Sequence, residues 1–356
     1  MCCGVNGAPL QTGRQEAEST ETPCSPPPAA ISRPGSYSKS NAIDAPLPQL
    51  KSCWFLTGAT ACGKTAVGIE LARRLNAEIL SLDSMAVYRG LDIGTAKPTA
   101  AERGRVPHHL LDLVEPDESF SLAMYLQAAR AATADVLSRG RTPLFVGGTP
   151  LYLKALLRGI FEGPPADWPF RRELLALADS QGSQVLHDRL AAVDPAAAVR
   201  LPSGDLRRIV RAIEVFEKTG RPMSDWQQQF DRARPAEELR VFVLSRPREE
   251  LNARIDRRVE AMFAAGLVDE VRNLLAAGKT IGRTAGQALG YREVLEHLRG
   301  ERDLGATVQL VQTRSRQFAK RQRTWFRSLR ECRDVAVAEG DDAASLAERV
   351  AVAGQR

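Results

Sequence analysis

The sequence of 356 residues has few cysteines and no long apolar run. Its six cysteines include no C-x-x-C pair, so neither a zinc site nor a disulfide framework is indicated. No stretch is long and apolar enough to cross a bilayer. The N-terminus lacks the unbroken apolar core of a signal peptide, and its glutamates are atypical of a transit peptide. We therefore expect a soluble, cytoplasmic protein with no membrane partner.

The first fifty residues lack apolar periodicity and contain eight of the 21 prolines. We predict that residues 1–50 form a disordered extension. The remaining sequence is typical of the α/β class. We divide it into a first core part (51–158), a helical insertion (159–235), a second core part with basic helices (236–338) and a C-terminal tail (339–356). The net charge of +6 favours an anionic partner, although many enzymes are mildly basic.

A phosphate-binding loop is the most specific motif of the chain. The apolar run 53–56 predicts a buried strand, which leads directly into GATACGKT at 58–65, a match to G-x-x-x-x-G-K-[ST]. Lys64 supplies a positive charge, and the Thr65 hydroxyl is the predicted Mg²⁺ ligand. Helical spacing over 66–75 places a helix N-terminus at the loop, which favours anions. The predicted diphosphate-binding residues are Gly58, Ala59, Thr60, Ala61, Cys62, Gly63, Lys64 and Thr65.

Two further apolar runs end at polar or glycine residues. The run 77–82 ends in Asp83-Ser84, and ligands of open parallel sheets bind outside the carboxyl ends of the strands. Asp83 is therefore a candidate general base, with a helix cap or a salt bridge as the alternative. The run 143–146 ends in Gly147-Gly148-Thr149, where a nucleotide-hydrolysing motor usually carries an acidic Mg²⁺ residue.

Three other features carry hypotheses of their own. Cys62, among the loop amides beside Lys64, is expected to be reactive, and its alkylation is expected to block the loop. His108 and His109 have no further ligand at metal spacing, which favours a structural role over metal binding. The helix predicted at 206–217 carries Arg207, Arg208 and Arg211 away from its apolar face, as a basic rim or as a solvated surface.

The C-terminal stretch 314–330 contains seven basic residues and no acidic one. We predict a helix with Val311, Phe318, Trp325 and Leu329 on its inner face. Arg316, Lys320, Arg323 and Arg327 would then point outward. This pattern favours a surface for a polyanion over an ordinary solvated face, which usually mixes charges of both signs.

These features together resemble the tRNA dimethylallyltransferases, the isopentenyl transferases that act on tRNA, over about residues 52–330. The resemblance depends on eight motifs in family order. They are GATACGKT (58–65), Asp83-Ser84 with YRGLDIGTAKP (88–98), PHHLLD (107–112), VGGTPLYLKALL (146–157), RRIVRAIEVF (207–216), RIDRR (254–258), ALGYRE (288–293) and QFAKRQRTWFR (317–327). The implied fold is a P-loop NTPase-like parallel sheet with an inserted all-helical domain and a C-terminal helical region.

The resemblance implies transfer of a dimethylallyl group from dimethylallyl diphosphate to N6 of adenosine 37, beside the tRNA anticodon, by a monomer with Mg²⁺ as cofactor. Asp83 would take the proton from the amine, while Thr65 and Arg258 would help to stabilise the diphosphate. The tRNA, bound through its anticodon stem-loop, would contact Asp83, Ser84, Met85, Ala86, Thr149, Arg171, Arg207, Arg208, Ile209, Val210, Arg211, Gln287, Ala288, Leu289, Gly290, Tyr291 and Arg292.

The sequence departs from the family pattern at three positions. Ala59 and Cys62 replace the Pro and Ser most common in the loop, and Ala86 stands where Gln is frequent. Two alternatives stay open from the residues alone. A P-loop small-molecule kinase would bind ATP at the same loop, but it would need an acidic Mg²⁺ residue and has no use for a basic C-terminal helix. A non-catalytic RNA-binding protein would not need the intact Lys64-Thr65.

Overall fold

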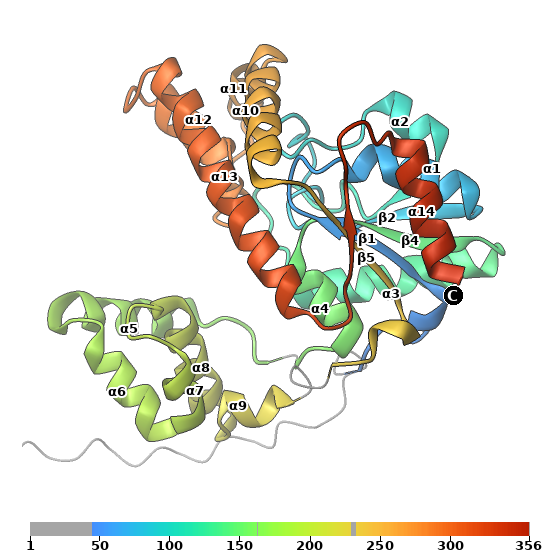
Figure 1. The fold of residues 1–356 in the computed structure, drawn as a ribbon. Helices are drawn as coiled ribbons and strands as arrows, with labels where there is room; N and C mark the ends of the chain where they lie inside the picture. The colour runs from blue at the N-terminus through green and yellow to red at the C-terminus, as the bar shows by residue number, and fades with distance from the viewer. Residues whose placement is uncertain (1–44, 162, 229–232, 356) are drawn as a thin grey trace, which may run out of the picture. The chain divides into compact units, whose positions relative to one another are not determined.

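The computed structural model describes residues 45–161, 163–228 and 233–355. Its centre is a six-stranded, all-parallel sheet with the order β3-β2-β4-β1-β5-β6 (Figure 1). The strands are β1 (Trp54–Gly58), β2 (Ala77–Ser81), β3 (His108–His109), β4 (Thr142–Gly147), β5 (Arg240–Ser245) and β6 (Arg333–Ala336). The predicted α/β class is confirmed, and β1 lies between β4 and β5, so the phosphate loop leaves the middle of the sheet.

Alternate residues of β1 pack on opposite faces of the sheet. Trp54 and Leu56 face α1 (Lys64–Arg74) and α14 (Ala343–Gln355). Phe55 faces α3 (Leu122–Ser138) and α4 (Pro150–Arg158), and its ring stacks on Phe145 with 5.0 Å between centroids. Figure 1 shows the two pairs of helices on the two sides of the sheet. Because such a strand is buried on both faces, its side chains are apolar from Trp54 to Leu56, and each large one contributes about 1.5–3 kcal/mol by burial.

Both ends of the described chain join this core. Leu47 and Leu50 are buried, and the Leu47 N–H donates to Leu156 O. The predicted disorder of residues 1–50 is therefore wrong at its C-terminal end, while residues 1–44 lie outside the described part. The segment predicted as a tail contains α14, which buries Leu346 and Val350 against the sheet. Its apolar side chains recur at helical spacing, and a tail would leave them exposed.

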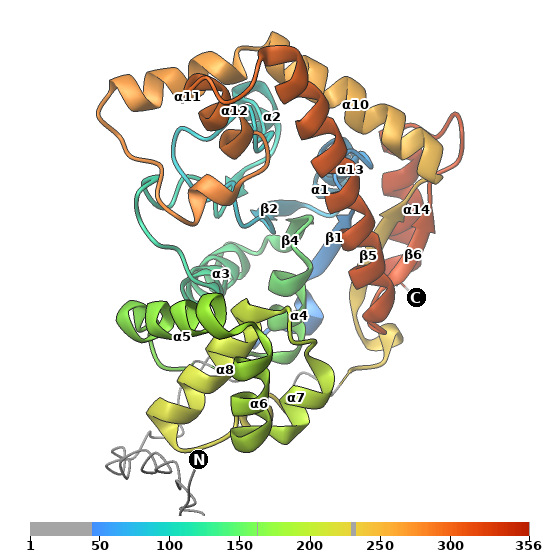
Figure 2. The ribbon, with the colours of Figure 1, turned by 90° about the vertical axis from the view of Figure 1, so that its left-hand side faces the viewer.

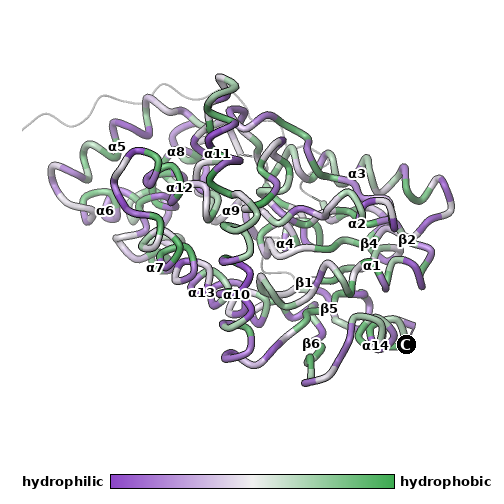
Figure 3. Tube along the Cα trace, turned by 90° about the horizontal axis from the view of Figure 1, so that it is seen from above, coloured by the Kyte–Doolittle hydropathy of each residue, from purple (hydrophilic) through white to green (hydrophobic). Residues whose placement is uncertain are grey.

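The described residues of the inserted segment form helices joined by short loops, with no strand among them. It contains α5 (Trp168–Gln181), α6 (Gln184–Val193), α7 (Pro195–Arg200), α8 (Leu206–Thr219) and α9 (Met223–Trp226). Helix α8 begins after Asp205, whose side chain accepts from Arg208 N, and ends at Gly220 in the left-handed conformation. Ile209 and Ile213 form its core with Leu186 and Leu190. Figure 3 shows how hydrophobic and hydrophilic residues alternate along the helices.

The remaining helices follow β2 and β5. They are α2 (Ala100–Arg105), α10 (Arg248–Ala264), α11 (Leu267–Ala276), α12 (Tyr291–Leu298) and α13 (Leu304–Ser328). Short 3₁₀ turns cover Leu50–Ser52, Ala236–Glu238 and Ala285–Gln287. No helix in the described part of the chain is long and apolar enough to span a membrane.

The predicted inner face of α13 is wrong in part. The buried positions are Thr307, Val311, Ser315, Ala319, Gln322 and Phe326, while Trp325 is 40 % exposed. The prediction placed on the inner face the large apolar side chains that recur every seven residues from Val311 to Trp325. The helix instead buries a row at spacings of three and four, which packs against α10 and α12 and, at Gln322, against the phosphate loop. Figure 2 shows α13 crossing in front of the strands.

Candidate active site

The phosphate loop between β1 and α1 has a backbone that few residues could adopt. A Cβ on Gly58 would lie 2.6 Å from Leu244 O, and Gly63 has a φ of 102°. Ala61 has a φ of 63°, which is sparsely populated by residues other than glycine. Four backbone N–H groups of the loop have no hydrogen-bond acceptor among the described residues, apart from regular bonds within helix α1. They are those of Ala61, Gly63, Lys64 and Thr65. The turn therefore leaves several N–H groups free for an anion.

Lys64 is folded back onto the loop. Its Nζ donates to Gly58 O at 3.0 Å and to Ala59 O at 2.7 Å. Burial lowers the pKa of the Lys64 ammonium, the charge of Arg258 lowers this pKa as well, and Asp83 raises it. The three residues that the sequence assigned to the base and the diphosphate therefore lie within electrostatic reach of one another.

Two arginines hold the outer side of the loop. Arg246 Nε donates to Cys62 O at 3.0 Å, and Arg254 Nε donates to Ala61 O at 2.9 Å. Arg246 also forms an ion pair with Glu250. These hydrogen bonds satisfy the carbonyl groups of Ala61 and Cys62 and help to hold the shape of the loop. Neither arginine was predicted to belong to the site.

The glycines at the end of β4 allow this strand to approach the backbone that follows β2 very closely. A Cβ on Gly147 would lie 2.2 Å from Leu82 O. Thr57 Oγ1 donates to Gly147 O at 2.9 Å, and Thr149 Oγ1 accepts from Ser84 N at 3.1 Å. These contacts place the Asp83-Ser84 turn beside the phosphate loop. An acidic side chain at Gly147 would not fit, which explains the glycine where a motor carries a carboxylate.

Gly147→Ala is expected to push the ends of β2 and β4 apart, because the added methyl overlaps a backbone oxygen. Overpacking of this kind costs about 1–3 kcal/mol or more, and the shift moves Asp83. We expect loss of most transferase activity and a lower melting temperature. The matched control is Gly104→Ala in α2, where an added Cβ meets nothing within 4 Å. Full activity of Gly147→Ala would contradict the role of this contact.

Asp83 caps a turn and still has a free oxygen. Its Oδ1 accepts from Met85 N at 2.8 Å and from Ala86 N at 3.3 Å. Oδ2 makes no hydrogen bond or ion pair with the described residues, and the side chain is only partly buried. The cap and the general base, which the sequence left as alternatives, are therefore compatible in one carboxylate.

Arg258 of α10 is the remaining predicted catalytic side chain. It makes no hydrogen bond or ion pair with the described residues. Burial lowers the pKa of its guanidinium, and the negative charge of Asp83 raises it. Arg258 is partly buried, and removing a cation from water without a partner is costly, so this guanidinium is available to an anion at the loop.

The Thr65 hydroxyl is the one predicted metal ligand. The described residues contain no cluster of three His, Cys, Asp or Glu that could hold a metal, and Thr65 makes no side-chain hydrogen bond with them. Mg²⁺ keeps several waters and is usually bound through one or two protein ligands plus substrate phosphates. The hydroxyl beside a diphosphate cradle is compatible with that mode of binding.

Comparison with known proteins identifies the family. The model of the family described as IPP transferase matches residues 86–329, and that of isopentenyl transferase matches residues 51–111. A tRNA dimethylallyltransferase of Rhodopirellula baltica is 46 % identical over 299 residues, which are 82 % of this chain and 90 % of the relative. That of Syntrophobacter fumaroxidans is 50 % identical over 275 residues, 77 % of this chain and 80 % of the relative. This chain belongs to the tRNA dimethylallyltransferase family.

Solved structures agree with this family. The tRNA isopentenylpyrophosphate transferase of Bacillus halodurans is 37 % identical, with a TM-score of 0.60 over 85 % of this chain and 96 % of that one. A eukaryotic dimethylallyltransferase acting on tRNA is 26 % identical, with a TM-score of 0.69 over 84 % of this chain and 77 % of that one. The predicted P-loop NTPase-like fold of the dimethylallyltransferase family is confirmed.

Several residues that the family resemblance assigned to tRNA contact have buried side chains. Ile209 and Val210 lie in the core of the helical insertion, and Ala86 and Ala288 are also buried. The Tyr291 hydroxyl donates to Glu270 and accepts from Gly94 N. These side chains fill cores, so the tRNA contacts predicted at these positions stay a prediction and would have to be made by the backbone. The buried side chains support the exposed neighbours Arg207, Arg208, Gln287 and Arg292. Ser84, Met85, Thr149 and Leu289 are partly buried, and Gly290 is buried.

The predicted tRNA ligands Arg171 and Arg211 share one buried carboxylate. Glu214 accepts from Arg171 Nε at 2.9 Å and also from Asp167 N at 2.7 Å, and it pairs with Arg211. Burial alone would raise the pKa of the Glu214 carboxyl, but these hydrogen bonds hold this pKa below its usual value. The two arginines are thus neutralised in part, unlike the unopposed basic rim that was predicted.

Glu214→Gln is expected to destabilise the insertion by about 2–4 kcal/mol near neutral pH, because two partly buried arginines lose their counter-charge. The folded-state pKa of Glu214 is depressed, so its contribution is present above the unfolded pKa and is lost as pH falls through the folded value. Urea unfolding at several pH values should show the variant and the parent converging in acid. A constant difference at all pH values would contradict this account.

Other predicted residues have structural roles or are less accessible than expected. His109 Nε2 lies 2.6 Å from Glu78 Oε2, and His108 Nδ1 lies 2.7 Å from Val106 O. Both histidines thus have protein partners. Cys62 is 1 % exposed, so its thiol is less accessible to a reagent than expected, and the block of the loop by its alkylation stays a prediction. In the segment 88–98, the buried Lys97 Nζ donates to Asp92 and Asp112.

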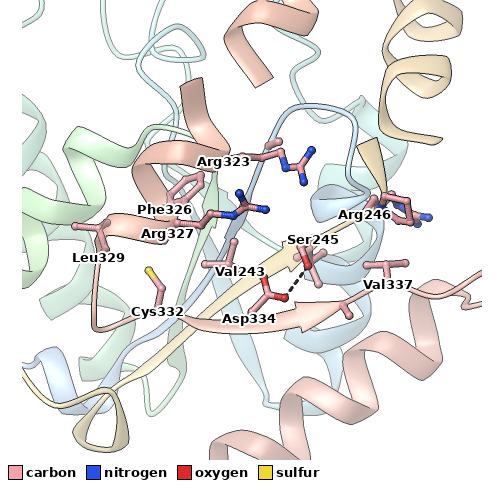
Figure 4. Close-up of a pocket in the computed structure, with 14 residues that line it drawn as sticks. Val243, Ser245, Arg246, Arg323, Phe326, Arg327, Leu329, Cys332, Asp334 and Val337 are labelled. Carbon is pink, nitrogen blue, oxygen red and sulfur yellow. Dashed lines mark hydrogen bonds between the residues drawn. The ribbon is translucent and has the colours of Figure 1, made fainter. Parts of the chain in front are cut away.

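A cavity of about 590 Å³ lies on the far side of the loop from β4. It is lined by Ala59, by the ends of β5 and β6, and by Arg323 and Arg327 of α13. Figure 4 shows both guanidinium groups reaching over the strand ends, where Ser245 Oγ is hydrogen-bonded to Asp334. Neither arginine has a hydrogen bond or ion pair with the described residues. Two uncompensated cations therefore border the phosphate loop.

Proposed function

We propose that this chain transfers a dimethylallyl group from dimethylallyl diphosphate to N6 of adenosine 37, next to the tRNA anticodon, and releases diphosphate. One observation carries the proposal: a carboxylate with a free oxygen, Asp83, lies within electrostatic reach of Lys64 and Arg258 at the phosphate loop. The relatives are named tRNA dimethylallyltransferases, and one solved relative is described as acting on tRNA.

The carboxylate supplies the base that the acceptor needs. The lone pair of the adenine amine is delocalised into the ring, so this nitrogen is a poor nucleophile. As its bond to C1 of the dimethylallyl group forms, Asp83 Oδ2 accepts one of its two protons. The Met85 and Ala86 N–H groups hold the other oxygen, which orients the carboxylate before the acceptor arrives.

The loop stabilises the leaving group. When the C1–O bond breaks, its electron pair goes to diphosphate, and negative charge grows on the phosphate oxygens. Free N–H groups of the loop, the Lys64 ammonium and the Arg258 guanidinium can donate to these oxygens. Lys64 would exchange its bonds to Gly58 O and Ala59 O for bonds to the ligand. Mg²⁺, held by Thr65 and the diphosphate, would add further charge neutralisation.

The tRNA would bind through its phosphates and through an extruded base. On α13, Lys320, Arg321 and Arg327 are exposed with Trp325, a combination suited to a nucleic-acid backbone and unstacked bases. An adenine stacked inside an anticodon loop cannot reach Asp83, so we infer that it is flipped out. We further propose that the anticodon stem-loop is the part recognised and that the enzyme acts as a cytoplasmic monomer.

One assay separates this function from its rival. The protein is incubated with undermodified tRNA and either carbon-labelled dimethylallyl diphosphate or γ-labelled ATP. Label from the prenyl carbon should enter tRNA and, after digestion, appear in N6-modified adenosine. Transfer of label only from ATP would support a small-molecule kinase. Binding of tRNA without either transfer would support a non-catalytic RNA-binding protein.

A further inference from the structure

Gln322, which belongs to the motif at 317–327 but was not among the predicted site residues, is a buried amide at the centre of the site. It lies on α13 and is 4 % exposed. Its Oε1 accepts from Thr60 N at 2.9 Å, and its Nε2 donates to Gly148 O at 2.5 Å. One side chain therefore connects the phosphate loop with the glycine end of β4. Gln322 follows Thr60 by 262 residues and Gly148 by 174 residues in the sequence.

We propose that Gln322 is a positioning residue for the diphosphate, a role that deepens the proposed function and depends on it. The argument starts from Ala61, whose φ of 63° costs free energy in any residue with a Cβ. Such a conformation persists only when its surroundings hold it. Gln322 binds the N–H of Thr60, and Arg254 binds the carbonyl of Ala61. The strained residue is thus held on both sides, from α13 and from α10.

The two hydrogen bonds of Gln322 also fix the distance between the phosphate loop and the end of β4. A Cβ on Gly148 would lie 2.7 Å from Gln322 Nε2 and 3.6 Å from Lys64 Nζ. The amide group and the ammonium group therefore border the same small space. A neutral amide can satisfy both the Thr60 donor and the Gly148 acceptor. A carboxylate could satisfy only the donor, and its charge beside Lys64 would compete with diphosphate.

Three variants test the proposal. Gln322→Met keeps the length and burial of the side chain but removes both hydrogen bonds. Gln322→Glu keeps one acceptor and adds charge. The matched control is Gln317→Met, which changes an exposed glutamine of the same helix. For each, the Kd of inorganic diphosphate with Mg²⁺ is measured by calorimetry, together with the KM for dimethylallyl diphosphate, kcat, the tRNA affinity and the melting temperature.

We expect Gln322→Met to raise the diphosphate Kd and the donor KM about ten-fold, because two buried backbone groups lose their partners. Gln322→Glu should raise both constants about 100-fold relative to the parent, through repulsion of the polyanionic ligand. The tRNA affinity should stay within about two-fold, since the exposed cations of α13 are unchanged. Gln317→Met should behave like the parent protein in every measurement.

Two results would overturn the proposal. Unchanged diphosphate binding in Gln322→Met would show that the loop keeps its shape without the amide. Equal losses of diphosphate and tRNA affinity with a lower melting temperature would show a general packing role. Diphosphate binding is measured without any transfer. A parent protein that binds diphosphate but modifies no tRNA would therefore refute the proposed function, while the comparison of variants would still decide the role of Gln322.

Discussion

Asp83→Asn is expected to lower the rate of transfer about 10²–10⁴-fold, the usual contribution of a positioned general base. Asparagine is nearly the same size, and its Oδ1 can still accept from Met85 N and Ala86 N. The turn should therefore keep its shape, and what is lost is the oxygen that takes the proton. Steady-state transfer at saturating donor and tRNA measures the effect, and a gel-shift titration checks that the tRNA affinity changes only a few-fold.

Asp83→Ala provides the comparison for this experiment. It removes the base and the cap together, so it should be as inactive as Asp83→Asn and less stable by about 1 kcal/mol, the usual cost of a lost cap. If Asp83→Asn keeps activity within ten-fold of the parent while Asp83→Ala does not, the carboxylate acts through the turn, and another group must accept the proton.

Lys64→Met should have the second large effect. Methionine retains most of the buried length of the side chain but cannot donate to diphosphate, and loss of one such donor to developing charge costs about 10²–10³-fold in kcat. The donor KM should rise as well, because the ammonium binds the ground-state diphosphate. Initial rates of transfer, measured over a range of donor concentrations, separate the effect on kcat from the effect on KM.

The control for Lys64→Met is Lys51→Met, which removes the same charge at an exposed position near the sheet. It should leave both kinetic constants unchanged, because a surface ion pair of this kind contributes little. A normal kcat in Lys64→Met would mean that Arg258 and the loop amides neutralise the leaving group without the lysine, and the proposed division of roles would need revision.

Those parts of the site that depend on local structure could be predicted from the sequence. The loop 58–65 lies between a strand and a helix that the apolar pattern predicts, and Asp83 follows a strand of the same parallel sheet. Since parallel strands end at one edge, both segments were expected to meet, and they do. The helix predicted at 206–217 is equally local, and it is confirmed as α8.

The parts that were missed depend on packing between distant segments. The sequence around Gln322 does not indicate that it is buried, since its neighbours on α13 are basic or aromatic. Its burial depends on the phosphate loop and the end of β4, which pack against this side of α13. The same reason explains Arg246 and Arg254, whose partners are carbonyl groups of another segment. Gly147 could have been recognised as a site of close approach, but its partner, Leu82 O, could not.

The three side chains that hold the phosphate loop follow it in the chain by 184 residues (Arg246 from Cys62), 193 residues (Arg254 from Ala61) and 262 residues (Gln322 from Thr60). The ribosome thus completes the GATACGKT segment long before it makes the groups that give this segment its shape. A growing polypeptide would bind prenyl diphosphate more weakly until α13 has emerged, so the donor site reaches its full affinity only near the end of translation.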